Sequence, residues 1–249
     1  MNDIFEELSR TGFLSQMSNI YTCLPCVVVG NSNIASQMLD VQPVVNKRFK
    51  NDTVEQHPPI LSVPVIFPSS STSALTFPIS IGDTVLCVFS QRGLDTFKNS
   101  SSDSRFVTPT DFRKFDKRDA IAIPGLFPFS ESINNATVRS LPHSTSDLVV
   151  AHNLGGAEVE LRMRPDGSVL IKSPTAITVE CQTAVVNVSA STTINCPATE
   201  WSGNLTFNGD VTLNGALTQL GVYSLDGINM NSHVHGGVQP GPSNTSVPQ

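Results

Sequence analysis

The second half of the chain repeats a short apolar motif at nearly constant spacing. Two apolar residues at positions i and i+2 recur six times, and the starts of successive pairs lie 8, 9, 8, 11 and 6 residues apart. In order, the pairs are Val169/Ile171, Ile177/Val179, Val186/Val188, Ile194/Cys196, Leu205/Phe207 and Val211/Leu213. Residues i and i+2 of an extended strand point to the same face, and Ser-Pro, Asn-Gly or Ser/Thr corners separate the pairs. This pattern predicts a β-solenoid in which each short strand buries one narrow apolar row.

One chain cannot bury so narrow a row by itself. Each strand offers two inward-facing residues, which is too few for a monomeric core of ordinary thickness. Three chains wound around a common axis would close the row from all sides. We therefore expect a homotrimeric, triple-stranded β-helix rather than a wide solenoid made by one chain.

The charged residues are few and unevenly distributed. They make up 14% of the sequence, against about 25% in typical soluble domains, which excludes a disordered polyelectrolyte and a coiled coil. Ser, Thr and Asn fill the difference and favour turns and strands, so the expected class is all-β. Beyond Lys172 the chain has no lysine or arginine, and its only acids are Glu180, Glu200, Asp210 and Asp226. A nucleic-acid surface needs clustered cations, so these 77 residues do not offer one.

The first 140 residues carry a different, strand-rich pattern. A helix is predicted over 3–20, followed by strands at 26–29, 39–43, 60–67 and 84–89. A proline inside the third strand argues for an edge or a bulge, whereas the fourth is apolar on both faces and predicts a central, buried strand. An apolar segment at 120–129, broken by two prolines, is expected to pack in an extended form. Four or five short strands in about 100 residues predict a small closed barrel.

These patterns divide the chain into four parts. Residues 1–20 are expected to form an N-terminal helix or arm, 21–140 a barrel collar, 141–228 the shaft and 229–249 an apex. Within the shaft, strands at 148–150 and 159–163 and a turn at 164–168 precede the repeat. The start of the chain lacks the basic and apolar regions of a secretory signal, and no run reaches the ~20 apolar residues of a membrane span. We therefore expect synthesis in the cytosol.

The apex contains the sharpest local motif, His233-Val234-His235. In an extended segment both imidazoles point the same way. In a monomer they would be ordinary histidines of a solvated tail, but three chains meeting on an axis would place six imidazoles in two layers of three. Such a closed octahedral shell suits Fe better than Zn, which prefers four ligands. We expect one structural Fe(II) ion per trimer, held by six His ligands from three chains.

Neither the cysteines nor the carboxylates form a convincing reactive site. Cys23 and Cys26 have the spacing of a metal or redox motif, but no second such pair exists, and we interpret them as apolar residues of a strand. A glycosidase needs two carboxylates across one cleft, whereas Glu158 and Glu160 lie on one short segment and the later acids are far apart. No nucleophile, phosphate-binding or zinc-protease motif is present. We therefore expect no enzyme activity and no catalytic residues.

The one basic cluster of the first half consists of Arg113, Lys114, Lys117 and Arg118. Aspartates at positions 111, 116 and 119 interleave with it. Alternating signs of this kind are typical of a solvated surface whose charges pair with each other. The cluster therefore argues against a nucleic-acid partner.

Several segments between residues 25 and 129 resemble the N-terminal domain of central spike proteins of contractile-tailed phages. The matching segments, in order, are Leu39–Pro43, Val63–Pro68, Phe77–Ile79 with Gly82-Asp83, Phe89–Arg92 and Asp119–Leu126. The C-terminal half is similar to the trimeric β-helix and apex of the same spikes, which are related in design to the valine-glycine tip proteins of type VI secretion. The resemblance implies an N-terminal OB-fold barrel followed by a homotrimeric triple-stranded β-helix, with apical iron held by His233 and His235.

The resemblance also implies a function and a location. The protein would be a structural tail-tip spike that pierces the host outer membrane mechanically during tail contraction. It would be made in the host cytoplasm and reside in the virion at the tip of the tail baseplate. Its N-terminal domain would bind baseplate or tail hub proteins, and its contact with the host outer membrane would be transient. A receptor- or glycan-binding tail fibre and a polysaccharide-degrading tailspike remain the alternatives.

Overall fold

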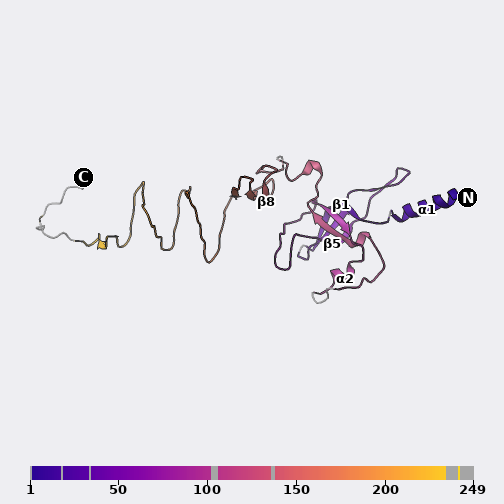
Figure 1. Cartoon of the computed structure of the whole chain (residues 1–249), viewed down its shortest axis with the longest axis horizontal. Coiled ribbons are helices and arrows are strands. Elements are labelled where there is room, and N and C mark those ends of the chain that lie inside the picture. The colour runs from indigo at the N-terminus through magenta and orange to yellow at the C-terminus, as the bar shows by residue number, and fades with distance from the viewer. Residues whose placement is uncertain are drawn as a thin grey trace. The chain divides into compact units, whose positions relative to one another are not determined.

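The computed structural model describes residues 2–17, 19–33, 35–101, 106–135, 138–233 and 241. The chain forms two units, Met1–Glu180 and Cys181–Gln249, which we describe separately. Strands are the main regular structure of the first unit (Figure 1). Among the described residues, no helix combines the length and the apolar character that crossing a membrane requires.

The first unit is built around a five-stranded antiparallel sheet with the order β5-β2-β1-β6-β7. Its strands are β1 (Cys23–Asn33), β2 (Met38–Pro43), β5 (Ile60–Pro64), β6 (Thr84–Phe89) and β7 (Ala120–Pro124). The sheet curls so that its two edges approach each other. Val65, just after β5, forms a parallel bridge to Ala122 of β7, and the Ile66 amide donates to the Ala122 carbonyl at 3.0 Å. The result is a curled half-barrel.

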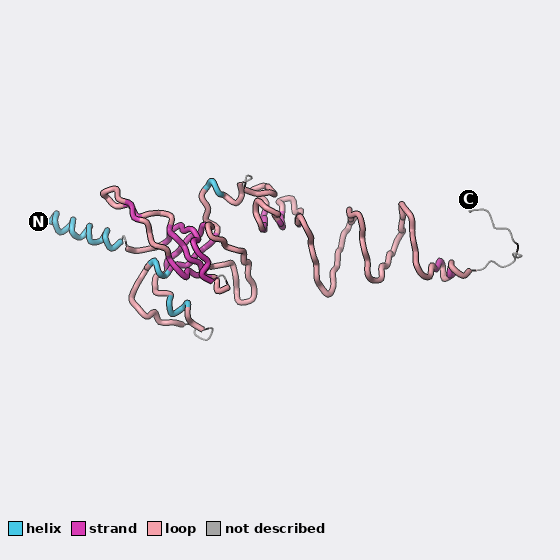
Figure 2. The backbone as a smooth tube through the Cα atoms, turned by 180° about the vertical axis from the view of Figure 1, so that it is seen from behind, coloured by secondary structure: helices cyan, strands magenta, loops and turns pink. Residues whose placement is uncertain are grey.

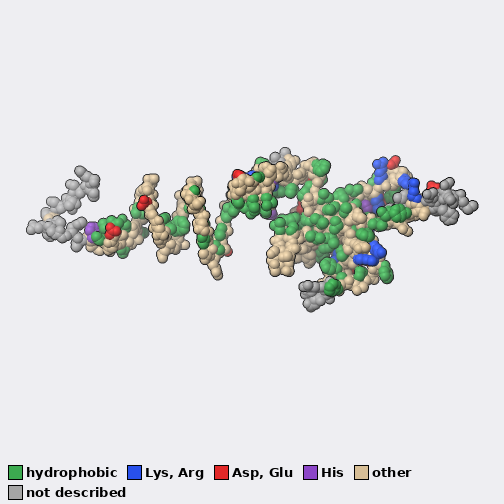
Figure 3. Space-filling model, viewed as in Figure 1, with side chains coloured by type: hydrophobic (Ala, Val, Ile, Leu, Met, Phe, Trp, Pro, Cys, Tyr) green, Lys and Arg blue, Asp and Glu red, His purple; other side chains and the backbone are tan. Residues whose placement is uncertain are grey.

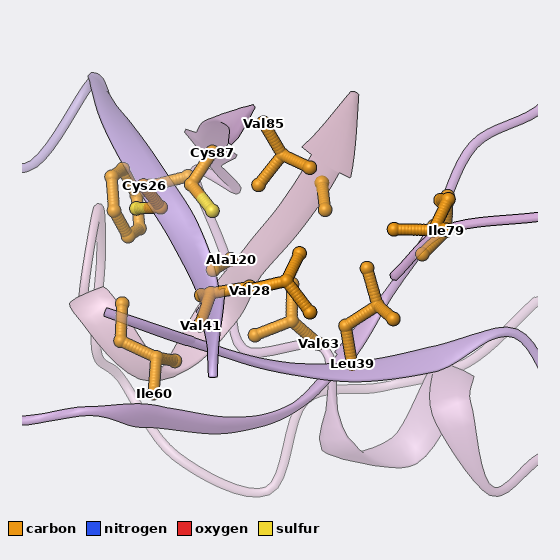
Figure 4. Packing of buried hydrophobic residues seen from close by; sticks show 13 residues of the cluster. Cys26, Val28, Leu39, Val41, Ile60, Val63, Ile79, Val85, Cys87 and Ala120 are labelled. Atoms are coloured by element: carbon orange, nitrogen blue, oxygen red, sulfur yellow. The ribbon is translucent and has the colours of Figure 1, made fainter. Parts of the chain in front are cut away.

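The core of this half-barrel fills the concave side of the sheet. Alternate residues of β2 and β6 are buried, as a strand with one face toward a core requires. Figure 4 shows how the side chains from these strands pack together. The buried apolar residues are Cys26, Val28, Leu39, Val41, Ile60, Val63, Val65, Ile79, Val85, Cys87, Phe89, Ala120 and Ala122. The prediction that 84–89 is a central strand is confirmed by its two neighbours, but its burial on both faces is wrong, because only every second residue is buried.

Strand β5 has the irregular edge that its proline predicted. It pairs with β2 on one side only, and the register shifts between Leu39 and Val41 of β2. At this point Ser62 adopts a positive φ of 54°, and its amide donates to the Asp40 carboxylate at 2.9 Å. The bulge thus has a side-chain partner that replaces the missing ladder bond.

The remaining elements of the first unit are short, apart from the N-terminal helix. They are α1 (Asn2–Met17), β3 (Lys47–Arg48), β4 (Val54–Glu55), α2 (Asp95–Lys98), and the 3-10 turns η1 (Lys117–Asp119) and η2 (Phe129–Glu131). The predicted N-terminal helix is therefore confirmed, with slightly different ends. The extended form expected at 120–129 is confirmed for Ala120–Pro124, which form β7, and only Phe129 at the end of the segment enters the 3-10 turn η2.

A second sheet follows the half-barrel along the chain. It has three antiparallel strands, β8 (Leu148–His152), β9 (Val159–Met163) and β10 (Val169–Lys172), with β9 in the centre. The predicted turn between β9 and β10 is present, and the Arg164 amide donates to the Ser168 carbonyl at 3.0 Å. Gly167 takes a φ of 83°, which explains why a glycine is needed there. We call this three-stranded sheet the neck sheet.

The second unit has little regular structure. Its only strands among the described residues are β11 (Ser224–Leu225) and β12 (Ile228–Asn229), joined by a two-residue turn. Asp226 and Gly227 have φ values of 49° and 79°, which is the backbone of an Asp-Gly hairpin turn. Upstream of the hairpin, residues 181–222 form a loop that swings back and forth (Figure 2). The strands predicted from Ile177 to Leu213 do not form in the single chain, so the triple-stranded β-helix stays a prediction.

Candidate functional site

Residues 173–222, which we call the shaft segment, expose the side chains that the sequence predicts to be inward-facing. Every residue from 174 to 228 is exposed in the single chain. Val186 is 80% exposed and Val188 is 51% exposed, although both belong to the apolar repeat. A soluble protein rarely leaves so many large apolar side chains in one continuous stretch of water-exposed chain. The pairs therefore have no partners in their own chain.

The backbone of the shaft segment also lacks the hydrogen bonds of regular secondary structure. From 173 to 222, all of which the structure describes, no residue belongs to a helix or strand, and no backbone–backbone hydrogen bond is formed. Side-chain contacts are few; in one of them the Gln219 amide donates to the Val222 carbonyl at 2.9 Å. A chain with free peptide groups and alternating apolar side chains has both of the features that strand pairing with another chain satisfies.

The shaft segment also carries a glycine repeat with a period of six residues, which the apolar pairs alone do not reveal. Glycines recur at positions 203, 209, 215, 221 and 227. From Gly203 to Leu217 the odd-numbered residues are glycine or large and apolar, while the even-numbered ones are polar except Ala216. An added Cβ at Gly203, Gly209 or Gly215 would meet nothing within the single chain. The glycines are thus not explained by packing inside one chain, as expected for positions where backbones of several chains approach closely.

The apex begins at the β11–β12 hairpin. The Met230 amide donates to the Tyr223 carbonyl at 2.7 Å, and the Asn231 side-chain amide donates to the Gly221 carbonyl at 3.0 Å. These bonds hold the chain just before His233. The other half of the predicted metal motif, His235, lies outside the described residues.

The ring of His233 is held by a backbone carbonyl. Its Nδ1 lies 3.0 Å from the Met230 carbonyl oxygen. A carbonyl only accepts hydrogen bonds, so Nδ1 is the donor in this contact. Metal-bound histidines commonly donate the other ring N–H to a carbonyl in this way, which fixes the tautomer. Within the described part of the chain, no three His, Cys, Asp or Glu side chains gather at one place, so one chain alone does not form a closed metal site there.

The two cysteines with metal-type spacing do not come together. Cys23 is exposed, whereas Cys26 is buried in the core beside Cys87 of β6. A hydrogen bond with Cys26, together with burial, raises the pKa of the Cys87 thiol above its usual value. Cys26 therefore belongs to the packing of the half-barrel, as the strand interpretation predicted, whereas Cys23 is exposed at the start of β1.

The carboxylates considered for glycoside cleavage are held by arginines. Glu158 and Glu160 are buried, and Arg139 Nη2 lies 2.5 Å from Glu158 Oε1. Arg162 Nη2 lies 2.7 Å from Glu160 Oε1. Burial alone would raise the pKa of Glu158, but hydrogen bonds from the Leu141 and Ser140 amides and from Arg139 lower it below its usual value. An ionised carboxylate in an ion pair is a poor proton donor.

The two arginines of the basic cluster of the first unit form internal ion pairs. Arg113 contacts Asp119 at 2.7 Å and Asp111 at 2.6 Å, and it also reaches Asp95, which the sequence pattern did not identify. Burial would raise the pKa of Asp119, but hydrogen bonds from Arg113 and the Leu94 amide lower it. The hydrogen bonds from Arg118 lower the pKa of Asp116 to about 2. Arg113 and Arg118 thus form ion pairs with aspartates, as predicted.

Comparison with known proteins identifies part of the first unit. Residues 24–125 match the family described as "Phage protein Gp138 N-terminal domain". No curated protein matches the chain. The match spans the five-stranded half-barrel and nearly coincides with the segment whose motifs resemble phage spikes, but it covers less than half of the 249 residues. The half-barrel is therefore similar to a phage protein domain.

Proposed function

We propose that the protein is the homotrimeric, non-enzymatic central spike of a contractile phage tail, and that it pierces the host outer membrane. The observation that carries the proposal is the shaft segment, whose apolar side chains are exposed and whose backbone forms no backbone–backbone hydrogen bond in its own chain. It follows a domain that matches a phage protein family in the same chain. Three such segments wound around one axis would satisfy the side chains and the backbone at the same time.

The closed trimer would suit passage through a membrane. Its strands would hydrogen-bond to each other, so few peptide groups would meet lipid unpaired. A charged side chain at the bilayer centre costs roughly 2.5–3.5 kcal/mol on insertion scales. The chain beyond Lys172 carries four acids and no lysine or arginine, which keeps this cost low. With its apolar pairs turned inward, the shaft would also lack the apolar surface that would retain it in the bilayer.

The apex would be closed by His233 and His235 of three chains around one iron ion. The metal would supply a structural cross-link, because six imidazoles leave no position for a substrate. The Met230 carbonyl would orient the His233 ring so that Nε2 faces the metal. At the other end, the half-barrel, an OB-fold in this proposal, would attach the spike to baseplate or hub proteins.

The location can be tested on virions of the phage that encodes the chain. Gold-labelled antibodies raised against the half-barrel should mark the tip of the baseplate, and the label should be lost when the gene product is depleted. Labelling along side fibres would instead support a receptor-binding fibre. Cleavage of a host surface polysaccharide by the purified protein would overturn the non-enzymatic role.

A further inference from the structure

We propose that the exposed face of the neck sheet is the surface on which three copies of the chain first associate, and that it sets their register for the shaft. This inference rests on the proposed trimeric spike and names the part of the chain that starts its assembly. It is carried by the composition of the face, by what covers the opposite face, and by the lack of structure downstream.

One face of the neck sheet is apolar throughout its centre and exposed. The strand registers align Leu148 with Met163 and Val150 with Leu161 across β8 and β9. Across β9 and β10 they align Met163 with Val169 and Leu161 with Ile171. The apolar residues of this face are Leu148, Val150, Val159, Leu161, Met163, Val169 and Ile171, of which all but the partly buried Leu161 are exposed. Figure 3 shows hydrophobic side chains gathered around the position of β8.

The opposite face is covered by the chain itself. There Glu160 and Arg162 point away from the apolar face, and both are buried. Arg162 contacts Glu160 at 2.7 Å and approaches Asp147 to 4.0 Å, and Arg139 lies 3.7 Å from Glu160. The sheet thus has an unusual polarity, with ion pairs on its buried side and apolar residues on its open side. Because the chain itself covers the face with the ion pairs, the apolar face stays exposed on a sheet that is already formed in one chain.

Further copies of the same chain are the partner that fits this face. Its strand residues include no lysine, arginine, aspartate or glutamate, and their one titratable side chain is the exposed His152 opposite Val159, so a partner needs little charge to match the face. The chain leaves β10 directly into the shaft segment, whose next apolar pair, Ile177/Val179, keeps the odd-numbered positions of Val169 and Ile171. The apolar row of the neck sheet therefore continues in sequence into the first pair of the shaft segment, although the next two pairs, Val186/Val188 and Ile194/Cys196, fall on even-numbered positions. A three-fold arrangement would place three identical faces against one another.

The order of assembly follows from where structure already exists. The neck sheet is hydrogen-bonded within one chain, whereas residues 173–222 form no backbone–backbone hydrogen bond. Fixing each residue of an extended chain loses conformational entropy, which must be offset by contacts made at the same time. Association at a preformed face avoids that loss and brings three shaft segments together at a common starting residue. The shaft then forms from β10 toward the apex.

The test compares full-length variants by solution mass and by hydrogen exchange. Val150→Asp places a charge at the centre of the face and should abolish the trimer, leaving a 26.7 kDa monomer with an unprotected shaft although the shaft sequence is unchanged. Val54→Asp, a matched change at an exposed valine of β4, should leave the trimer intact. Val188→Asp within the shaft should remove shaft protection but retain concentration-dependent association through the neck.

Several results would overturn the inference. A Val150→Asp variant that remains a trimer with a protected shaft would show that assembly does not start at this face, while leaving the proposed spike standing. A monomeric wild-type protein would overturn both the inference about the neck sheet and the proposed trimeric spike. In Val150→Asp, protection of the β9 amides from hydrogen exchange would show that the neck sheet still folds. The milder change Leu148→Ser should also weaken association of the trimer, to a smaller extent. Pulse-labelled refolding should protect 148–172 before 173–222, and the reverse order would contradict the proposal.

Discussion

A charge at Val188 provides a sharp test of the buried shaft. Val188 is 51% exposed in the single chain, so about half of its side chain remains to be buried in the trimer. Burying a whole valine side chain is worth about 1.5–3 kcal/mol, so the variant Val188→Asp loses about 1 kcal/mol per chain from this source. An unpaired carboxylate inside a low-dielectric core costs several kcal/mol more. Over three chains the total is roughly 10–15 kcal/mol, which equals the whole stability of an ordinary domain.

Hydrogen exchange followed by mass spectrometry measures this effect segment by segment. In the wild type, amides of residues 173–222 should be protected, because the trimer pairs them. In Val188→Asp they should exchange freely, while the half-barrel strands β1 and β6 keep their protection. Asn187→Asp is the matched control, because it adds the same charge one residue away, on the opposite side of an extended strand. A protected shaft in Val188→Asp would show that this residue faces solvent and that the assumed register is wrong.

Three further predictions concern the apex, the neck and the acid sensitivity of the half-barrel. Purified without a histidine tag, the wild type should contain one third of an iron equivalent per chain. The double variant His233→Ala with His235→Ala should contain no iron while its shaft stays trimeric, and an unchanged iron content would show that the metal is bound elsewhere. Glu160→Ala leaves Arg162 buried without its closest carboxylate, so the free energy of opening the neck sheet, measured by hydrogen exchange of the β9 amides, should fall by about 3–5 kcal/mol. A fall of less than about 1 kcal/mol would contradict a structural role for the ion pair. Because the pKa of Asp116 is lowered in the folded state, the residue stabilises that state at pH values above its unfolded pKa near 3.8, and this contribution is lost as the pH falls toward about 2. Asp116→Asn should therefore flatten the dependence of urea stability on pH in this range, and an unchanged slope would refute the assignment.

The sequence predicts the half-barrel well because its signals are local. Alternation places Leu39 and Val41 of β2, and Val85 and Cys87 of β6, on one buried face. Pro64 marks β5 as an irregular edge for the same kind of local reason. What the sequence does not show is that Arg113 also reaches Asp95, 18 residues earlier in the chain. That contact depends on how distant segments pack.

The C-terminal half is predicted less completely for a different reason. Its strands need hydrogen-bonding partners from other chains, so the alternation of residues such as Val211 and Leu213 produces exposed side chains in one chain alone. The charged back of the neck sheet was also missed, since Glu160 and Arg162 alternate with apolar residues as they would on a water-facing surface. Their burial comes from the segment containing Arg139, which has no regular secondary structure to signal it. The glycine spacing was visible in the sequence and is the signal that best fits a repeating shaft.

The mass of the full chain in solution tests the central claim most directly. One chain weighs 26.7 kDa, and sedimentation equilibrium reports the mass without assumptions about shape. A trimeric spike predicts a species near three times that mass, stable on dilution, because the shaft cannot exist without three chains. A monomer with all shaft amides freely exchanging would contradict the trimer, the buried apolar rows and the six-histidine apex together.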